Sequence, residues 1–270
     1  MEIVEGVYPS FRFPRHAHPH FTFSVLTAGG QHFEHRGRTT LLGGGDVVLL
    51  NPDEAHANAP ISQSWSHVSL CFSEAALAEV APEFRGKRIA IGSTVVRDQA
   101  ISLRLPELAY LPGRAESELA ELTLRVVDTV FRKHSRTAPP RNTGISVDTV
   151  RERLLDAPEI NVSLVELSRI AGTSVTSLLR SFTKACGCTP HTFQTGLRID
   201  RSKRLLRAGY EIADAASITG FVDQSHFTHT FRRWLGITPA RYREQVFHRD
   251  RPQSEQRQRP RVRSTGYAGR

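Results

Sequence analysis

The sequence predicts an α+β protein of two domains, with a β-rich N-terminal half and an all-helical C-terminal half. Short apolar runs broken by glycines fill residues 21–72, helical periodicity follows in residues 114–134, and a 49-residue repeat occupies the C-terminal part. At 270 residues with 39% hydrophobic content, the chain is long and apolar enough to give each domain its own core.

The strands expected in the N-terminal half are apolar runs of β-forming residues with close, glycine-marked spacing. They are FTFSVLTA (21–28), QHFEH (31–35), TTLL (39–42), DVVLLNP (46–52) and SHVSLCF (66–72). Short strands at this spacing are typical of a β-sandwich or barrel, here predicted over about residues 11–72.

A helical segment is expected over residues 94–134. Within it, residues 114–134 carry one apolar stripe at helical spacing, formed by Leu119, Leu122, Val126, Val127 and Val130. This helix can pack on the barrel or on a second copy of itself. The following SRTAPPRNTG, residues 135–144, reads as a linker because its prolines and polar residues support no regular element.

The repeat in the C-terminal half predicts two helix-turn-helix units. Its clearest marks are Gly187-x-Thr189-Pro190 and Gly236-x-Thr238-Pro239, which lie 49 residues apart. Each copy predicts a short helix (163–171; 211–219), a glycine turn (Gly172; Gly220) and a second helix (175–185; 224–235), and this order defines a helix-turn-helix.

A longer helix is expected between the copies, over residues 190–206. Its basic residues are expected to contact solvent or phosphate; they are Arg198, Arg201, Lys203, Arg204 and Arg207. In each second helix an apolar pair at i, i+4, Leu178 with Phe182 and Phe227 with Phe231, faces the domain core and leaves a polar face opposite.

The charge is divided unevenly along the chain. Residues 1–140 hold 14 basic and 15 acidic residues, whereas residues 141–270 hold 22 basic and 12 acidic ones. This asymmetry favours a polyanionic partner for the second half. Residues 248–270 contain seven arginines and few apolar residues, which predicts a disordered tail.

Localisation is predicted from what the sequence lacks. No apolar window is long enough for a membrane span, the N-terminus has no secretion-signal pattern, and three scattered cysteines do not form a disulfide framework. The sequence therefore predicts a cytoplasmic protein with no membrane partner.

The second half resembles the DNA-binding domain of AraC/XylS transcriptional regulators over residues 146–246. The residues that carry the resemblance are Gly220-Phe221, Asp223-Gln224-Ser225, Phe227, Phe231, Arg232-Arg233, Gly236-Ile237-Thr238-Pro239 and Tyr242-Arg243. The resemblance implies a DNA-binding domain over 145–247 whose two second helices enter successive major grooves of double-stranded DNA. It also implies a transcriptional regulator and not an enzyme, with RNA polymerase as a partner and a homodimer as the assembly.

Roles of single residues also follow from this resemblance. The base-reading set is expected to be Thr176, Leu179 and Arg180 in the first unit and Ser225, Thr228 and His229 in the second, with Gln224, Arg232 and Arg233 on the DNA backbone. The family usually has arginine in place of His229 and an aliphatic residue in place of Ala215. Histidine lacks the bidentate fork of arginine, so the second helix is expected to read fewer bases. Arg180 is expected to read a guanine, with a phosphate contact as the alternative.

The first half, residues 1–134, resembles the cupin-like effector domain that many family members carry. The resemblance lies in RHAHPHFTFSVLTAGG and GGDVVLLNPDEAHA. It implies a small-molecule effector, and His16, His18, His20 and His56 are expected to line its pocket. These histidines could also bind a metal, but FTFSVL lacks the glutamate of metal-dependent cupins, so neither a metal nor a cofactor is predicted.

Two other functions stay open on the sequence. One is a cupin-type metal-dependent enzyme with an appended basic domain. The other is a nonspecific nucleic-acid binder that depends on the arginine-rich tail. The duplicated helix-turn-helix favours the regulator over both.

Overall fold

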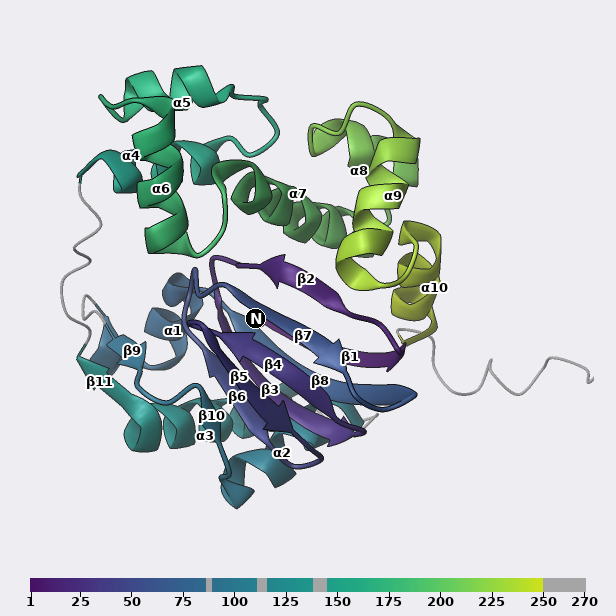
Figure 1. The fold of residues 1–270 in the computed structure, drawn as a ribbon. Coiled ribbons are helices and arrows are strands. Elements are labelled where there is room, and N and C mark those ends of the chain that lie inside the picture. The colour runs from purple at the N-terminus through teal and green to yellow at the C-terminus, as the bar shows by residue number, and fades with distance from the viewer. Residues whose placement is uncertain (86–88, 111–115, 138–144, 250–270) are drawn as a thin grey trace, which may run out of the picture.

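The computed structural model describes residues 1–85, 89–110, 116–137 and 145–249. A β-rich N-terminal half carries a helical C-terminal half on one side, and the two contact each other (Figure 1). Within the described residues no helix is long and apolar enough to cross a membrane.

The N-terminal half is built from two main antiparallel sheets. The strands are β1 (Glu2–Pro9), β2 (Phe13–His16), β3 (Phe21–Ala28), β4 (Gln31–His35), β5 (Arg38–Leu42), β6 (Val47–Leu50), β7 (His56–Pro60), β8 (Ser64–Phe72), β9 (Ile89–Ile91) and β10 (Val95–Val96). One sheet has the order β1-β8-β3-β6-β10 and the other the order β2-β7-β4-β5. Among the described strands, pairing stays within each sheet, so the predicted barrel takes the form of two facing sheets.

Each face of the five-stranded sheet buries a separate apolar cluster. On the inner side, Leu26, Phe33 and Trp65 belong to a cluster that joins the two sheets. On the outer side, Phe21 and Phe23 pack with helices α2 (Gln99–Tyr110) and α3 (Glu116–His134). The small elements α1 (Glu74–Val80) and η1 (Pro82–Phe84) follow β8.

The expected apolar stripe of α3 is used inside the chain. Leu122, Val126, Val127 and Val130 are buried, and Leu119 is partly buried against the same cluster. Of the two expectations for this helix, packing on the β-domain is therefore confirmed. The opposite face of α3 carries exposed ion pairs, Arg125 with Glu121 and Arg132 with Asp128.

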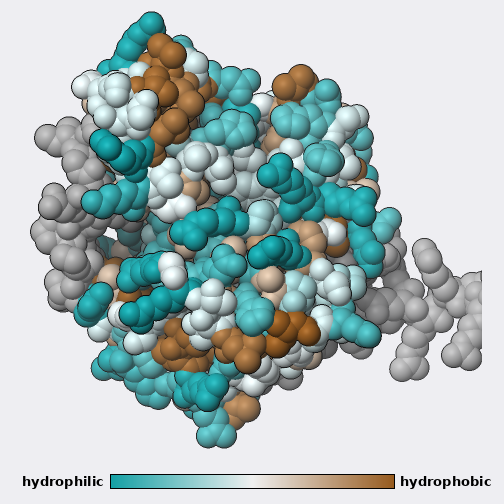
Figure 2. Space-filling model, viewed as in Figure 1, coloured by the Kyte–Doolittle hydropathy of each residue, from teal (hydrophilic) through white to brown (hydrophobic). Residues whose placement is uncertain are grey.

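The C-terminal half has the predicted tandem arrangement of helices. They are α4 (Ile145–Asp156), α5 (Leu164–Ile170), α6 (Val175–Cys186), α7 (Pro190–Arg207), α8 (Ile212–Ile218), α9 (Gln224–Leu235) and α10 (Pro239–Arg249). Helix α7 runs across the β-domain with α4–α6 at one end and α8–α10 at the other (Figure 1). Figure 2 shows apolar side chains gathered over α5, where Leu164, Val165 and Ile170 are exposed.

The helix ends follow from side-chain caps and glycines. Ser174 and Asp223 cap α6 and α9 by accepting main-chain N–H groups, and Gly187 and Gly236 end these helices in the left-handed conformation. The two copies of the repeat thus share one capping scheme, which explains why sequence spacing located these helices within one residue.

Several expectations need correction. Residues 135–137 form strand β11 (Ser135–Thr137), paired with β9, where a linker was expected. Strands β1, β2, β7, β9 and β10 were not predicted. Strand β10 lies at the start of the expected helical segment 94–134, where its main chain pairs with β6, so the helices of this segment begin only at Gln99. Residues 138–144 and 250–270, which hold the rest of the predicted linker and most of the predicted tail, lie outside the described residues.

Gly220 is predicted to be far more sensitive to substitution than Gly209. Both have positive φ, but a Cβ at Gly220 would lie 2.1 Å from the main-chain oxygen of Glu159, whereas a Cβ at Gly209 would meet nothing within 4 Å. Gly209→Ala should cost roughly 1–2 kcal/mol of unfolding free energy from backbone strain alone, and Gly220→Ala clearly more. Urea unfolding of both variants measures these changes in unfolding free energy. Equal decreases for the two variants would contradict the close contact between Gly220 and Glu159.

Candidate functional site

The first candidate recognition helix, α6, separates a buried from an exposed face. Leu178, Phe182 and Cys186 are buried against α4, α5 and α7. Thr176 and Arg180 are exposed on the other side, whereas Leu179 is half-buried. Two of the three residues expected to read bases in this unit are therefore exposed.

The second candidate recognition helix, α9, has the same division. Phe227 and Phe231 are fully buried, and the side chain of Asp223 accepts the main-chain N–H of His226 at 2.7 Å. The exposed side chains are Gln224, Ser225, His229, Arg232 and Arg233, and Thr228 is half-buried. These donors and acceptors match those that contact base edges and phosphates.

Arg198 of α7 joins the two helix-turn-helix units. Its guanidinium donates to the main-chain oxygens of Pro158 (2.7 Å), Gly220 (3.0 Å) and Glu159 (3.3 Å) and to Oδ1 of Asn161 (2.8 Å). The segment 158–161 precedes α5 and Gly220 precedes α9, so one side chain connects both units. Burying a guanidinium costs free energy because it loses its water, and these hydrogen bonds compensate that cost.

The expectation that the basic residues of α7 can contact solvent or phosphate is wrong for Arg198 and Lys203. Arg198 and Lys203 are buried and Arg201 pairs with Glu159 at 2.5 Å, whereas Arg204 is exposed. Arg207 pairs with Glu2. The carboxylates and carbonyls that satisfy these cations come from segments distant in sequence, which a helical pattern does not reveal.

Polar contacts among the described residues join the C-terminal half to the β-domain, and three of the links involve Glu2, Asp53 and Arg15. Glu2 of β1 binds Lys203, at 3.2 Å, and Arg207; Asp53 binds Arg151 of α4 at 2.6 Å. The third link is from Arg15, which donates to the main-chain oxygen of Gly187 at 3.0 Å. Burial alone would raise the pKa of Glu2, but the two cations outweigh it and hold that pKa at about 2. The link through Glu2 is therefore ionised throughout the physiological range.

A cavity of about 160 Å³ lies between the two sheets and is bordered by the helical half. The β-domain contributes Tyr8, Trp65, His67 and Gln31, whose Oε1 is buried and has no hydrogen-bond partner among the described residues. The helical half contributes Gly196, Ile199, Asp200 and Lys203 of α7 and Trp234 and Leu235 of α9. A ligand in this cavity would contact both halves of the protein.

The four histidines expected at a pocket all line this cavity. They do not share one strand, because β2 ends at His16, but they still converge. One ring nitrogen each of His16, His18 and His56 lies within 4.8 Å of the others, so these three could hold a metal ion. His20 stacks on His18, with ring centroids 4.2 Å apart, and its Nδ1 is 3.9 Å from Asp200.

The histidines of the cavity are neutral at neutral pH. Burial lowers the pKa of His16, His18, His20 and His56, and burial lowers the pKa of His67 to about 4. Neutral imidazoles are hydrogen-bonding groups and metal ligands and do not act as fixed positive charges.

Sequence analysis did not identify His67, Trp65, Lys203 or Trp234 as cavity residues. Gly196, Ile199 and Lys203 lie at i, i+3, i+7 on α7, a spacing that places them on one helix face. That spacing shows which residues share a face, but it does not indicate that the face borders a cavity in another domain.

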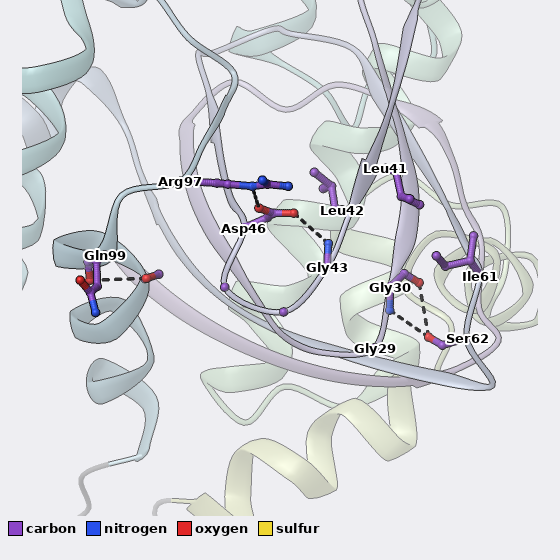
Figure 3. Close-up of a pocket in the computed structure, with 13 residues that line it drawn as sticks. Gly29, Gly30, Leu41, Leu42, Gly43, Asp46, Ile61, Ser62, Arg97 and Gln99 are labelled. Carbon is purple, nitrogen blue, oxygen red and sulfur yellow. Dashed lines mark hydrogen bonds and ion pairs between the residues drawn. The ribbon is translucent and has the colours of Figure 1, made fainter.

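A second hollow lies on the β-domain, away from the histidines (Figure 3). It is open and lined by Gly29–Gly30, Gly43–Gly45 and neighbouring residues. Its charged groups bind each other, because Nε of Arg97 donates to Asp46 at 2.9 Å and Asp46 also accepts the N–H of Gly43. The cavity between the halves, with its unpartnered Gln31 oxygen, is therefore the better ligand site.

Comparison with known proteins supports both parts of this description. Residues 1–123 match the profile of an AraC-like ligand binding domain, and residues 167–245 match a helix-turn-helix domain. The chain is 30% identical over 225 residues to YbfI, an uncharacterised HTH-type transcriptional regulator of Bacillus subtilis, covering 80% of this chain and 81% of YbfI. It is 21% identical over 260 residues to RhaS, a transcriptional activator of an Enterobacter species, covering 89% and 91%.

A solved structure shares the fold of nearly the whole chain. ToxT from Vibrio cholerae superposes with a TM-score of 0.61 at 12% identity, covering 90% of this chain and 98% of that one. A tandem helix-turn-helix domain joined to a ligand-binding β-domain defines a DNA-binding regulator of transcription. The chain belongs to the AraC/XylS family, and its relatives give no support to the alternative of a cupin-type enzyme.

The neutral state of His67 predicts that the folded protein loses stability on acidification. Its pKa is about 4 in the folded state against 6.5 for an ordinary histidine. Between these values the unfolded chain binds more protons, so stability falls as pH drops below about 6.5, by roughly 1 kcal/mol at pH 5.5 from this residue.

His67→Phe provides the control, because it keeps an aromatic ring against Tyr8 and Trp65, on both of which His67 stacks. The free energy of unfolding in urea, measured at about pH 7.5 and pH 5.5, should decrease less in this variant than in the parent. Equal decreases would assign the pH dependence to other groups.

Proposed function

We propose that this regulator reads its operator through the exposed faces of α6 and α9, placed in successive major grooves. Thr176, Leu179 and Arg180 of the first unit and Ser225, Thr228 and His229 of the second would read bases. Gln224, Arg232 and Arg233 would bind the DNA backbone. The observation that carries this proposal is that Arg198 fixes both units to α7, which leaves the polar faces of α6 and α9 exposed at opposite ends of that helix.

The length of α7 supports this arrangement. Its 18 residues span roughly 27 Å at 1.5 Å per residue. Successive major grooves on one face of DNA are about 34 Å apart, a distance that two helices at the ends of such a connector can match. Accessible Arg180 can pair bidentately with guanine, whereas His229 offers a single contact.

The effector is proposed to bind in the cavity between the two halves. Its lining includes His16, His18, His20 and His56, which the sequence assigned to an effector pocket, and residues from α7 and α9. A ligand that contacts Trp234 or Lys203 would favour one arrangement of the DNA-binding half over another. The ligand would bind the two arrangements with different free energies, and that difference would be the free energy available for regulation.

The other expected partners are proposed on the family resemblance. The protein would act in the cytoplasm as a homodimer and would contact RNA polymerase at the promoter. The apolar stripe of α3 is buried within the chain, so it is not free to pack on a second copy. A dimer formed through this helix would instead use the outer face of α3, where Leu124 is exposed among charged residues. Light scattering on the purified protein tests this part, and a monomer at all concentrations would remove it.

Substitution of Arg180 tests the reading of bases. The substitution Arg180→Ala should weaken binding to the natural operator by roughly 5–150-fold, equivalent to about 1–3 kcal/mol, and should leave binding to scrambled DNA nearly unchanged. Fluorescence anisotropy on DNA from upstream of the gene, against scrambled DNA of equal length across a salt series, measures both affinities.

A matched control is Arg38→Ala, because Arg38 is an exposed arginine on β5 in the β-domain, away from the face of α3 proposed for the dimer. This variant should bind both DNAs as the parent does. If Arg180→Ala weakens both DNAs equally and reduces the salt dependence, Arg180 contacts a phosphate instead of a base. If the parent protein binds both DNAs equally, the proposed sequence readout is wrong for that operator.

A further inference from the structure

The histidines of the cavity are arranged in a way that the binding of an organic effector alone does not explain. His16 and His56 are paired across β2 and β7 in the sheet register, with ring centroids 4.4 Å apart. His18, in the loop after β2, has its ring 5.1 Å from that of His56 and 6.0 Å from that of His16. Two separate chain segments thus bring three imidazoles to one point.

Hydrogen bonds select the same tautomer in all three rings. Nδ1 of His16 faces the main-chain oxygen of Pro14 at 2.8 Å, and Nδ1 of His56 faces that of Glu54 at 2.9 Å. Nδ1 of His18 faces the main-chain oxygen of His20 at 3.2 Å. A carbonyl oxygen only accepts, so each Nδ1 carries the proton and each Nε2 carries a lone pair.

Three neighbouring Nε2 lone pairs need a shared donor or a cation. Thr22 Oγ1 lies 3.3 Å from Nε2 of His18, but within the described part of the chain no protein donor reaches Nε2 of His16 or His56. Lys203 also lines the cavity, yet its ammonium group is bound by Glu2 at 3.2 Å and by Asp200 at 3.6 Å. Lys203 therefore does not supply a cation to these nitrogens.

We propose that His16, His18 and His56 bind one divalent transition-metal ion of the Zn²⁺ class through their Nε2 atoms. Imidazole nitrogens favour zinc and its neighbours over Mg²⁺ and Ca²⁺, which prefer oxygen ligands. Carbonyl groups that hold Nδ1–H are the usual support for metal-binding histidines. One ring nitrogen from each of the three histidines lies within 4.8 Å of the others, whereas the ligand nitrogens of a tetrahedral ion lie roughly 3.3 Å apart, so metal binding would draw the rings together.

The fourth coordination position would face the cavity. With three neutral ligands and no carboxylate, the ion would keep its positive charge and would accept water or an anionic or nitrogen-containing group there. His16 also packs on Trp234 of α9, with ring centroids 5.6 Å apart, so the metal site adjoins the helix proposed to read DNA. The proposal itself rests on the histidine geometry and does not depend on DNA binding.

Titration of the untagged full-length protein with Co²⁺ tests the site directly. We expect one ion per chain, with the visible absorption of tetrahedral Co²⁺ and displacement by Zn²⁺. Cu²⁺ should quench the tryptophan emission, because both tryptophans of the chain, Trp65 and Trp234, line the cavity.

Variants then assign the ligands. His16→Gln and His56→Gln should each weaken Co²⁺ binding by more than the roughly 10–100-fold that loss of a supporting hydrogen bond costs. The control is the double variant His32→Ala/His191→Ala, because both residues are exposed and lie outside the cavity. Circular dichroism of each variant, with and without metal, separates loss of the site from loss of the fold.

The outcomes distinguish Co²⁺ binding by the cavity histidines from adventitious Co²⁺ binding at the surface. Tetrahedral Co²⁺ absorption that His16→Gln and His56→Gln abolish, and the control keeps, supports the proposal. If these folded variants bind as the parent does, or if the parent shows no tetrahedral absorption, the proposed site is wrong. Loss of binding in the control variant would likewise assign the ion to surface histidines.

Discussion

The buried guanidinium of Arg198 is the interaction on which the arrangement of the C-terminal half depends. Its hydrogen bonds reach the segment before α5 and the turn before α9, so both helix-turn-helix units are fixed to α7 by one side chain. Removing it would leave the partly buried carbonyl oxygens of Glu159 and Gly220 without this donor, whereas Pro158 would keep the amide of Gln194, and each buried group left unpaired costs on the order of 1–3 kcal/mol. The spacing of the two recognition helices therefore has a specific structural origin and does not depend on helix packing alone.

The face of α7 opposite Arg198 packs against the β-domain and so connects the two recognition helices to it. Gly196 allows a close approach, since a Cβ there would lie 3.2 Å from both the main-chain oxygen of Ala17 and the ring of Trp234. Lys203 extends from the same face to Glu2 and borders the cavity. One helix thus fixes the recognition helices and closes the ligand cavity, which gives a direct physical route from an occupied cavity to DNA binding. The route requires two arrangements of the halves, and the structure describes one of them.

The sequence predicts local structure well and long-range contacts poorly. The capping residues and positive-φ glycines repeat at fixed spacing, so α6 and α9 could be located from the chain alone. Strand β2 could not, because FPRH has no alternating pattern and its hydrogen bonds come from β7. The four histidines expected at an effector pocket line one cavity, and their role there stays a prediction, whereas Lys203 was assigned to solvent or phosphate and is buried. Its partners, Glu2 and Asp200, include a residue about 200 positions away, and no helical period reports such a contact.

The proposed readout requires α6 and α9 to enter successive major grooves on one face of DNA. Hydroxyl-radical footprinting on the operator tests it most directly, because it maps contacts on both strands at single-nucleotide resolution. Each bound subunit should protect two tracts, with their centres about 10 base pairs apart on one face of the duplex. A single protected tract per subunit, or two tracts on opposite faces, would contradict the spacing that α7 and Arg198 impose.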